Sequence, residues 1–192
     1  YKSTYGRTAP SFSLVHYLYG TGKPWNKAIG KMTLILEENY EYERVRTVKM
    51  GSEDVTSQFT RLGEKTYQFE RENVEPKDYN DVFELELSSS YEFSGYRAFP
   101  FGFFYKDRLI TEKDLFWLDA EELRFVRNLI YALHGYEFKS QDLKEFVEIS
   151  GPDWNPPYKP NPNFSEDDLS EIEKENIQTI LEMEKKVKKM KK

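Results

Sequence analysis

The first half of the chain alternates apolar and polar residues over short stretches, which is the pattern of strands that bury one face. The clearest example lies within 81–88, where apolar residues and glutamates take turns: Phe83, Glu84, Leu85, Glu86 and Leu87. Weaker or shorter runs of the same kind, separated by turn residues, are 12–19, 29–37, 40–48, 55–62, 65–70 and 91–96. Six or seven short strands with turns between them predict an antiparallel β-sandwich or a barrel-like domain.

The second half changes to helical spacing. Residues 119–135 predict one amphipathic helix: Asp119 can cap its start, and Gly135 can supply the left-handed residue that ends it. Four apolar residues share one face of this helix: Leu123, Val126, Ile130 and Leu133. Three further helices are expected: a short one opening at Thr111, one running from Ser140 to about Ile149, and a last one of about 20–25 residues that opens at Ser165.

Two segments break these patterns. The aromatic cluster 99–104 predicts a hinge that packs under the helices, since a flexible linker would be rich in Gly and Ser. The segment 151–162 contains five prolines and predicts an extended strap without regular structure. The expected fold class is therefore α+β, with an antiparallel β-domain over 1–98 and a helical domain over 99–192.

The helical half also resembles a known family. The motifs that carry the resemblance are 109–115, 127–135, Phe138, 142–146, 154–158, Asn176, Ile177 and Glu184. Their order is similar to the YARHG domain of bacterial extracellular proteins, over about residues 99–186. Leu133 stands where that domain has the arginine of its name, so any role of that arginine is absent here. The resemblance implies a small helical fold and an extracellular, cell-surface or periplasmic location, and it implies no reaction.

Composition narrows the function classes. The chain of 192 residues has a net charge of −6 although six of its last eight residues are lysines, so the rest is strongly acidic and argues against nucleic-acid binding. There is no cysteine, which excludes disulfides, a thiolate nucleophile and Cys-ligated zinc. No apolar run is long enough to span a bilayer. The chain begins with Tyr1, which leaves room for a signal segment or lipid anchor ahead of it.

The candidate chemistry centres on the end of the helix 119–135, where polar residues lie one turn apart: Arg127, Asn128, Tyr131 and His134 beside Gly135. We interpret these as structural residues, because neither a nucleophile nor a substrate pocket can be inferred from their spacing. A buried Arg127 would need a carboxylate, and Asp114, Glu122 and Glu184 are candidates. No catalytic residue, metal ligand or cofactor is predicted.

Trp154 and Tyr158 on the proline-rich strap are candidate binding residues, because exposed aromatic rings can stack on a sugar or a peptide. The alternative is that they pin the strap to the helices.

Three functions stay open at this point. The leading one is a non-catalytic, secreted or surface-attached module, such as a lipoprotein, that binds a cell-surface protein, a wall polymer or a small apolar ligand. The others are a hydrolase using His134 or paired carboxylates in an interdomain groove, and a structural spacer.

Overall fold

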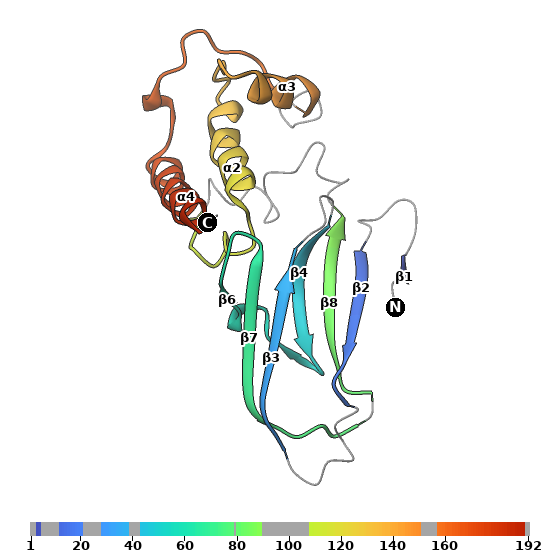
Figure 1. The fold of residues 1–192 in the computed structure, drawn as a ribbon. Coiled ribbons are helices and arrows are strands. Elements are labelled where there is room, and N and C mark those ends of the chain that lie inside the picture. The colour runs from blue at the N-terminus through green and yellow to red at the C-terminus, as the bar shows by residue number, and fades with distance from the viewer. Residues whose placement is uncertain are drawn as a thin grey trace. The chain divides into compact units, whose positions relative to one another are not determined.

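The chain divides into two compact units, Tyr1–Ser90 and Tyr91–Lys192. The computed structural model describes residues 3–4, 12–20, 28–38, 43–78, 80–89, 108–150 and 157–190. The expected domain boundary at 98, the aromatic cluster 99–104 and the candidate strand 91–96 lie outside these residues. The predicted α+β class is confirmed: the first unit holds antiparallel sheets and the second holds three helices (Figure 1).

The first unit, here called the β unit, contains a five-stranded sheet in the order β1-β2-β8-β4-β5 and a three-stranded sheet in the order β3-β7-β6. Its strands are β1 Ser3–Thr4, β2 Phe12–Leu18, β3 Ile29–Glu37, β4 Glu43–Met50, β5 Glu53–Asp54, β6 Thr60–Arg61, β7 Thr66–Val74 and β8 Val82–Ser89. All pairings are antiparallel. β3 and β4 follow one another in the chain but pair in different sheets, and the three longest pairings, β2 with β8, β4 with β8 and β3 with β7, join strands that are distant in sequence.

The alternation in β8 places its two faces as the sequence predicted. Phe83 and Leu85 are buried, and the rings of Phe83 and Phe69 meet across the two sheets with their centroids 5.6 Å apart. On the opposite face, Glu84 lies 3.3 Å from the His16 ring of β2 and 3.4 Å from the ammonium of Lys49 on β4. One face of β8 therefore builds the core while the other carries an ionic row.

β4 contains an irregularity that its apolar spacing reflects. Val45 and Val48 are both buried although they are three residues apart, which an ideal strand with a period of two does not allow. The register with β8 shifts between Val45 and Thr47, so one residue is left over there as a β-bulge. The bulge returns the later apolar positions of β4 to the core face.

The run 55–62 was expected to form a strand, and this prediction was wrong. Thr56–Gln58 form a 3-10 helix between the two-residue strands β5 and β6. The carboxylate of Asp54 accepts hydrogen bonds from the backbone N–H of Thr56 at 2.9 Å and from its hydroxyl at 2.6 Å, which stabilises a turn. Val55 and Phe59, the residues on either side of this 3-10 helix, are both buried, so the core holds the turn at both ends.

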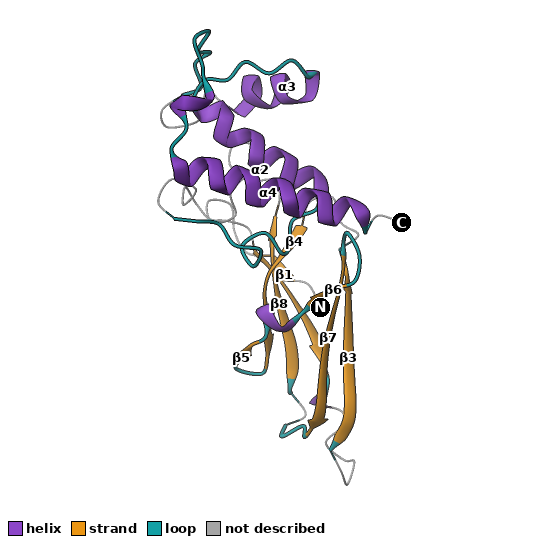
Figure 2. Cartoon of the chain, turned by 90° about the vertical axis from the view of Figure 1, so that its left-hand side faces the viewer, coloured by secondary structure: helices purple, strands orange, loops and turns teal. Residues whose placement is uncertain are grey.

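The second unit contains α2 Ala120–Leu133, α3 Gln141–Ser150 and α4 Glu171–Lys189 (Figure 2). Asp119 caps the start of α2, as the sequence predicted, and the structure adds that Glu122 completes a capping box there. The apolar face of α2 packs into one core with the buried face of α4. None of the described helices combines the length and the apolar character needed to cross a membrane.

Two helix predictions need correction. Residues 112–117 form successive turns instead of a short helix. The last helix does not begin at Ser165: Ser165 caps a separate 3-10 helix, Glu166–Asp168, and Ser170 caps α4. Leu169 is extended between them and buries its side chain at 4% exposure. Insertion of Leu169 into the core therefore divides what the sequence presented as one continuous helix.

Candidate functional site

The end of α2 is closed by a tight backbone turn. The N–H of Gly135 donates to the carbonyl of Ala132 at 2.9 Å, and the N–H of Tyr136 donates to Tyr131 at 3.1 Å. Gly135 has a φ of +79°, the left-handed conformation that the sequence predicted for a helix-ending glycine. The turn fixes where His134 leaves the helix.

The proline-rich strap runs directly against this turn. The N–H of Asn161 donates to the carbonyl of Gly135 at 2.8 Å. A Cβ on Gly135 would contact the carbonyl oxygen of Lys159 and come within 2.8 Å of the Cβ of Asn161. Glycine is therefore required here for two reasons, its conformation and the close approach of the strap.

His134 contacts the first turn of α4 through its ring. Its Nε2 lies 2.9 Å from Oε1 of Glu173, whose side chain is only 4% exposed. The other carboxylate oxygen of Glu173 accepts hydrogen bonds from the backbone N–H and the hydroxyl of Ser170, both at 2.9 Å. Burial alone would raise the pKa of the Glu173 carboxyl, but the bonds from His134 and Ser170 outweigh burial and lower this pKa.

This arrangement contains a serine, a histidine and a carboxylate, but they are joined in the wrong order for a catalytic triad. In a triad the serine hydroxyl contacts the histidine ring, and the acid contacts the far side of the ring. Here the serine hydroxyl and the histidine ring both contact Glu173. The geometry suits a joint between two helices.

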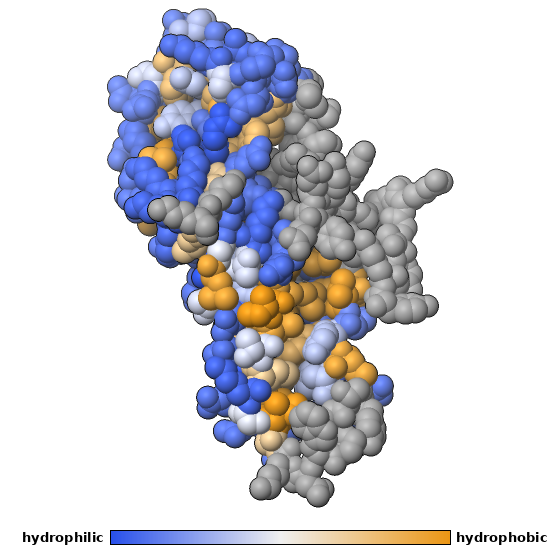
Figure 3. All heavy atoms as spheres, viewed as in Figure 1, coloured by the Kyte–Doolittle hydropathy of each residue, from blue (hydrophilic) through white to orange (hydrophobic). Residues whose placement is uncertain are grey.

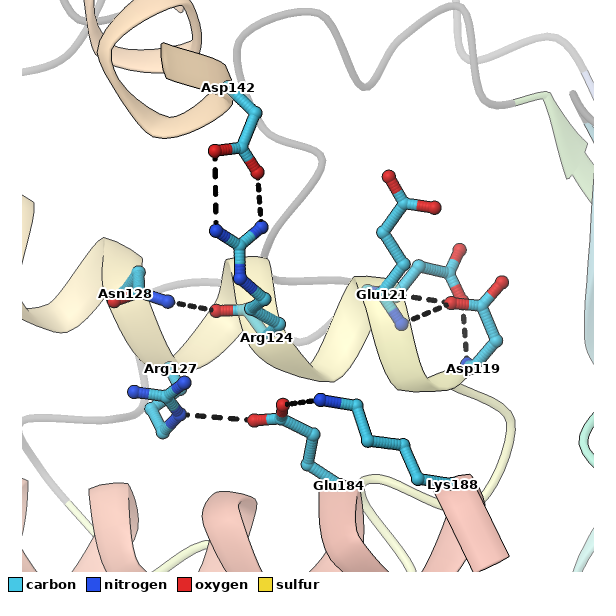
Figure 4. A network of polar contacts seen from close by, with 9 residues as sticks. Asp119, Glu121, Arg124, Arg127, Asn128, Asp142, Glu184 and Lys188 are labelled. Carbon is cyan, nitrogen blue, oxygen red and sulfur yellow. Dashed lines mark hydrogen bonds and ion pairs between the residues drawn. The ribbon is translucent and has the colours of Figure 1, made fainter. Parts of the chain in front are cut away.

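The arginines of α2 connect it to the other two helices (Figure 4). Nε of Arg127 donates to Glu184 of α4 at 3.1 Å, so Glu184 is the partner among the three acids that the sequence offered. Arg124 grips both carboxylate oxygens of Asp142 at the start of α3 and lowers the pKa of that carboxyl to about 2. The side-chain amide of Asn128 donates to the carbonyl of Arg124 at 2.7 Å, within the helix.

Aromatic rings pack around the end of α2. The ring of Tyr131 lies 5.8 Å from that of Tyr136 and 6.2 Å from that of Phe164. Tyr158, one of the two candidate binding residues, is half-buried, and its hydroxyl donates to the carbonyl of Tyr136 at 3.1 Å. The other candidate, Trp154, lies outside the described residues. The structure thus brings Tyr158 to the same helix end as Tyr131, His134 and Gly135.

The β unit has an incompletely covered core. Tyr17 and Phe83 are cross-strand partners and so share a face of the sheet, yet Tyr17 is 58% exposed and Phe83 is fully buried. Leu34 and Phe69 are likewise partners, with Leu34 half-buried and Phe69 1% exposed. We call the inward-facing, incompletely buried apolar residues of β2 and β3 the apolar rim: Val15, Tyr17, Met32, Leu34 and Leu36. Figure 3 shows apolar residues gathered on the visible face of the β unit.

Comparison with known families assigns the helical part. The model of the YARHG domain matches residues 103–185. This segment is a YARHG domain. No curated protein matches the sequence. A crystal structure from Legionella pneumophila, described as a "putative nutrient binding protein", is similar at 23% identity and a TM-score of 0.32, over 89% of this chain. The chain spans 52% of the length of that protein.

Within the YARHG domain, Leu133 occupies the position of the name-giving arginine. Its side chain is half-buried and packs against the apolar core of the unit. The substitution therefore replaces a cationic group with core packing. In the same helix, Arg127 contacts Glu184, and at its end His134 contacts Glu173 in an ion pair when the imidazole is protonated.

Asn176 is a residue whose function the sequence did not reveal. It lies on the buried face of α4 with no exposed surface. Its Oδ1 accepts a hydrogen bond from the N–H of Ile110 at 2.6 Å, and its Nδ2 donates to the carbonyl of Arg108 at 3.0 Å. The sequence contained two signals, the place of Asn176 among the motifs of the family resemblance and an amide next to apolar residues of the helix, and neither indicated the partner of the amide.

No metal site is apparent in the part of the chain that the structure describes, since no three His, Asp or Glu side chains gather there in a suitable cluster. The YARHG domain holds its polar residues in contacts between its own helices and turns. The β unit presents the apolar rim. The internal contacts of the YARHG domain favour a role as a scaffold. The apolar rim of the β unit favours contact with an apolar ligand or protein surface.

Proposed function

We propose that this protein is a non-catalytic bacterial module, secreted or attached to the cell surface, that binds a cell-surface protein, a wall polymer or a small apolar ligand. The apolar rim favours the apolar ligand among these, either a small molecule or an apolar segment of a protein. The YARHG domain serves as a scaffold in this proposal. A lipid anchor ahead of residue 1 would attach the module to the membrane.

The observation that carries the proposal is the contrast between the centre and the rim of the sandwich. Phe69 on β7, Phe83 on β8 and Val48 on β4 are excluded from water, whereas the inward positions on β2 and β3 remain in partial contact with it. Covering exposed apolar surface stabilises a complex by about 25 cal/mol per Å². Binding of a ligand that covers the rim therefore lowers the free energy of the complex, and it requires no change in the fold.

The contacts of His134 support the non-catalytic part of the proposal. A histidine that acts as a general base contacts an acid with one ring nitrogen and the group that gives up the proton with the other. Glu173 is shared between His134 and a serine that contacts only the acid. This use of the three groups ties α2 to α4 and accounts for their arrangement without a reaction.

Binding can be measured by titrating the chain with dodecanoate, with an apolar peptide and with a soluble wall glycopeptide. Calorimetry gives the heat of binding, and NMR gives the changes in backbone amide chemical shifts. We expect dodecanoate or the peptide to shift the resonances of β2 and β3. Tyr17→Ser should weaken this binding by about fivefold or more, because it removes the most exposed side chain of the rim. Leu62→Ser is the matched control, since Leu62 is 52% exposed but lies outside the rim.

Failure of all three ligands to bind would contradict the proposal, and so would equal losses in Tyr17→Ser and Leu62→Ser. The catalytic alternative has its own test. If His134→Gln abolished the hydrolysis of an ester or amide substrate while the helical circular dichroism stayed unchanged, the protein would be a hydrolase. Location is tested by fractionating cells that express the natural gene, where recovery in the cytoplasm would contradict surface attachment.

A further inference from the structure

β3 is a long edge strand. Its nine residues, Ile29–Glu37, pair with β7 on one side, and β7 in turn pairs with β6. Among the described residues β3 has no strand on its other side, and Figure 2 shows it at the outer side of the sheet. Alternate backbone N–H and C=O groups of such a strand point away from the sheet and can pair with another strand.

Several devices that usually protect an edge strand are missing from β3. It contains no proline, and its pairing with β7 runs from Ile29 to Glu37 without a shift of register. A bulge or a proline would prevent regular addition of another strand, and neither is present. Its outward face carries Lys31, Thr33, Ile35 and Glu37, all exposed. Ile35, 45% exposed, is an apolar residue in the middle of this face.

The sequence of β3 is complementary to itself in one register. We propose that β3 pairs with β3 of a second copy of this chain, antiparallel and centred on Leu34, so that Lys31 of each copy lies opposite Glu37 of the other. The same register places Met32 opposite Leu36 and Thr33 opposite Ile35. Each of these three pairs forms twice, as a twofold axis that passes between the two Leu34 residues requires.

Other ways of pairing the two strands fit less well. Centring the antiparallel pair on Thr33 moves Glu37 opposite Ile29 and Lys31 opposite Ile35, so both ion pairs are lost. Parallel pairing in register sets Lys31 beside Lys31 and Glu37 beside Glu37, and like charges directly opposite one another are destabilising. The charges therefore select both the direction and the register.

The ammonium of Lys31 lies 2.8 Å from Glu70 on the neighbouring strand β7. This contact does not compete with the proposed one, because an ammonium has three donors and the Lys31 side chain is 54% exposed. In the dimer, Lys31 would lie between Glu70 of its own chain and Glu37 of the other. Each lysine would then bridge two carboxylates across three neighbouring strands.

Pairing in this way would create one six-stranded sheet from the two three-stranded sheets. The twofold axis keeps equivalent faces on the same side, so Met32, Leu34 and Leu36 of both copies would form one apolar surface. Each copy would cover the edge of the other. Dimer formation does not depend on the ligand proposed above, since it uses the backbone edge of β3 and not the binding of a third molecule.

The test is to reverse the charge at position 31 or 37 and to measure the dissociation constant of the dimer by sedimentation in the analytical ultracentrifuge. The wild-type chain of 192 residues should form a concentration-dependent dimer. Lys31→Glu and Glu37→Lys should each raise the dissociation constant by about tenfold or more, because each change sets like charges opposite one another twice. An equimolar mixture of the two variants should dimerise again, since the carboxylates of the Lys31→Glu chain would face the ammonium groups of the Glu37→Lys chain.

Glu75→Lys is the matched control for Glu37→Lys, because it makes the same charge change at an exposed position beyond β7. It should leave the dissociation constant unchanged, and thermal unfolding of each variant will show that the monomer is still folded. A wild-type chain that stays monomeric up to about 100 μM would overturn the proposal. A dimer that survives both single variants, or a mixture that stays monomeric, would overturn it as well.

Discussion

Nε2 of His134 lies 2.9 Å from Oε1 of Glu173, so the residue that ends α2 contacts the first turn of α4 across 39 positions of sequence. The Glu173 carboxylate also accepts the hydrogen bonds that cap α4. One buried acid therefore serves two purposes: it starts one helix and holds the end of another. In this chain, the histidine next to Gly135 therefore has a structural role, which is to join α2 to α4.

Removal of the imidazole should test this role. His134→Ala leaves the buried carboxylate of Glu173 without its cationic or hydrogen-bonding partner from α2. We expect a loss of about 1.5–3 kcal/mol in the free energy of unfolding, the usual range for a hydrogen bond to a charged group. His134→Gln retains a donor and should lose less. Urea unfolding followed by circular dichroism at the helix band measures both, and equal stability of His134→Ala and wild type would contradict the assigned role.

Gly135 should tolerate no side chain. Gly135→Ala forces a positive φ on a residue with a Cβ and presses that Cβ against Lys159 and Asn161. The conformation alone costs roughly 1–2 kcal/mol, and displacement of the strap adds to it. Gly30→Ala is the matched control, since nothing lies within 4 Å of a Cβ there. Thermal melts should show a clear drop for the first variant and little change or a small gain for the second.

Asn176 should matter more than its neighbours on α4. Asn176→Ala leaves the N–H of Ile110 and the carbonyl of Arg108 without the partners that the amide supplies. Unsatisfied buried polar groups cost about 1–3 kcal/mol each, so we expect a loss of at least about 2 kcal/mol. Gln178→Ala, on the exposed side of the same helix, should change the stability by less than about 0.5 kcal/mol. Comparable losses in the two variants would show that the amide contributes no specific contact.

Stability at low pH should depend on Asp114. The guanidinium of Arg108, with hydrogen bonds from Thr111, lowers the pKa of Asp114 from an ordinary 3.8 to about 2. The unfolded chain therefore binds a proton there at higher pH than the folded chain does. The stabilisation is complete above about pH 4 and is lost as the pH falls through 2.

Asp114→Asn removes this titration, so the variant should lose less stability than wild type between pH 4 and pH 2. Arg108→Gln removes the largest cause of the shift and should also flatten the dependence, by a smaller amount. Denaturant midpoints measured across this range give the slopes. Parallel curves for wild type and Asp114→Asn would contradict the assigned pKa.

Local patterns in the sequence were sufficient for most of the elements. Asp119, Leu123 and Gly135 defined α2, because caps and helical spacing act within a few residues. The alternation of Phe83 and Leu85 with glutamates defined the two faces of β8 for the same reason. The split between Ser165 and Ser170 was missed, because both serines begin valid capping boxes and only the burial of Leu169 decides that the helix starts at the second.

The sequence by itself determined the α+β class, the order of the main strands and helices, and the residues that end α2, since these follow from side-chain periodicity and turn chemistry along the chain. Only the tertiary structure decided that β3 pairs with β7 and not with β4, and that Glu184, Glu173 and Asn176 are the partners of α2 and of residues 108–110. Such partners lie tens of residues apart. Their contacts depend on the packing of whole faces, and no local pattern distinguishes one acid on a distant helix from another.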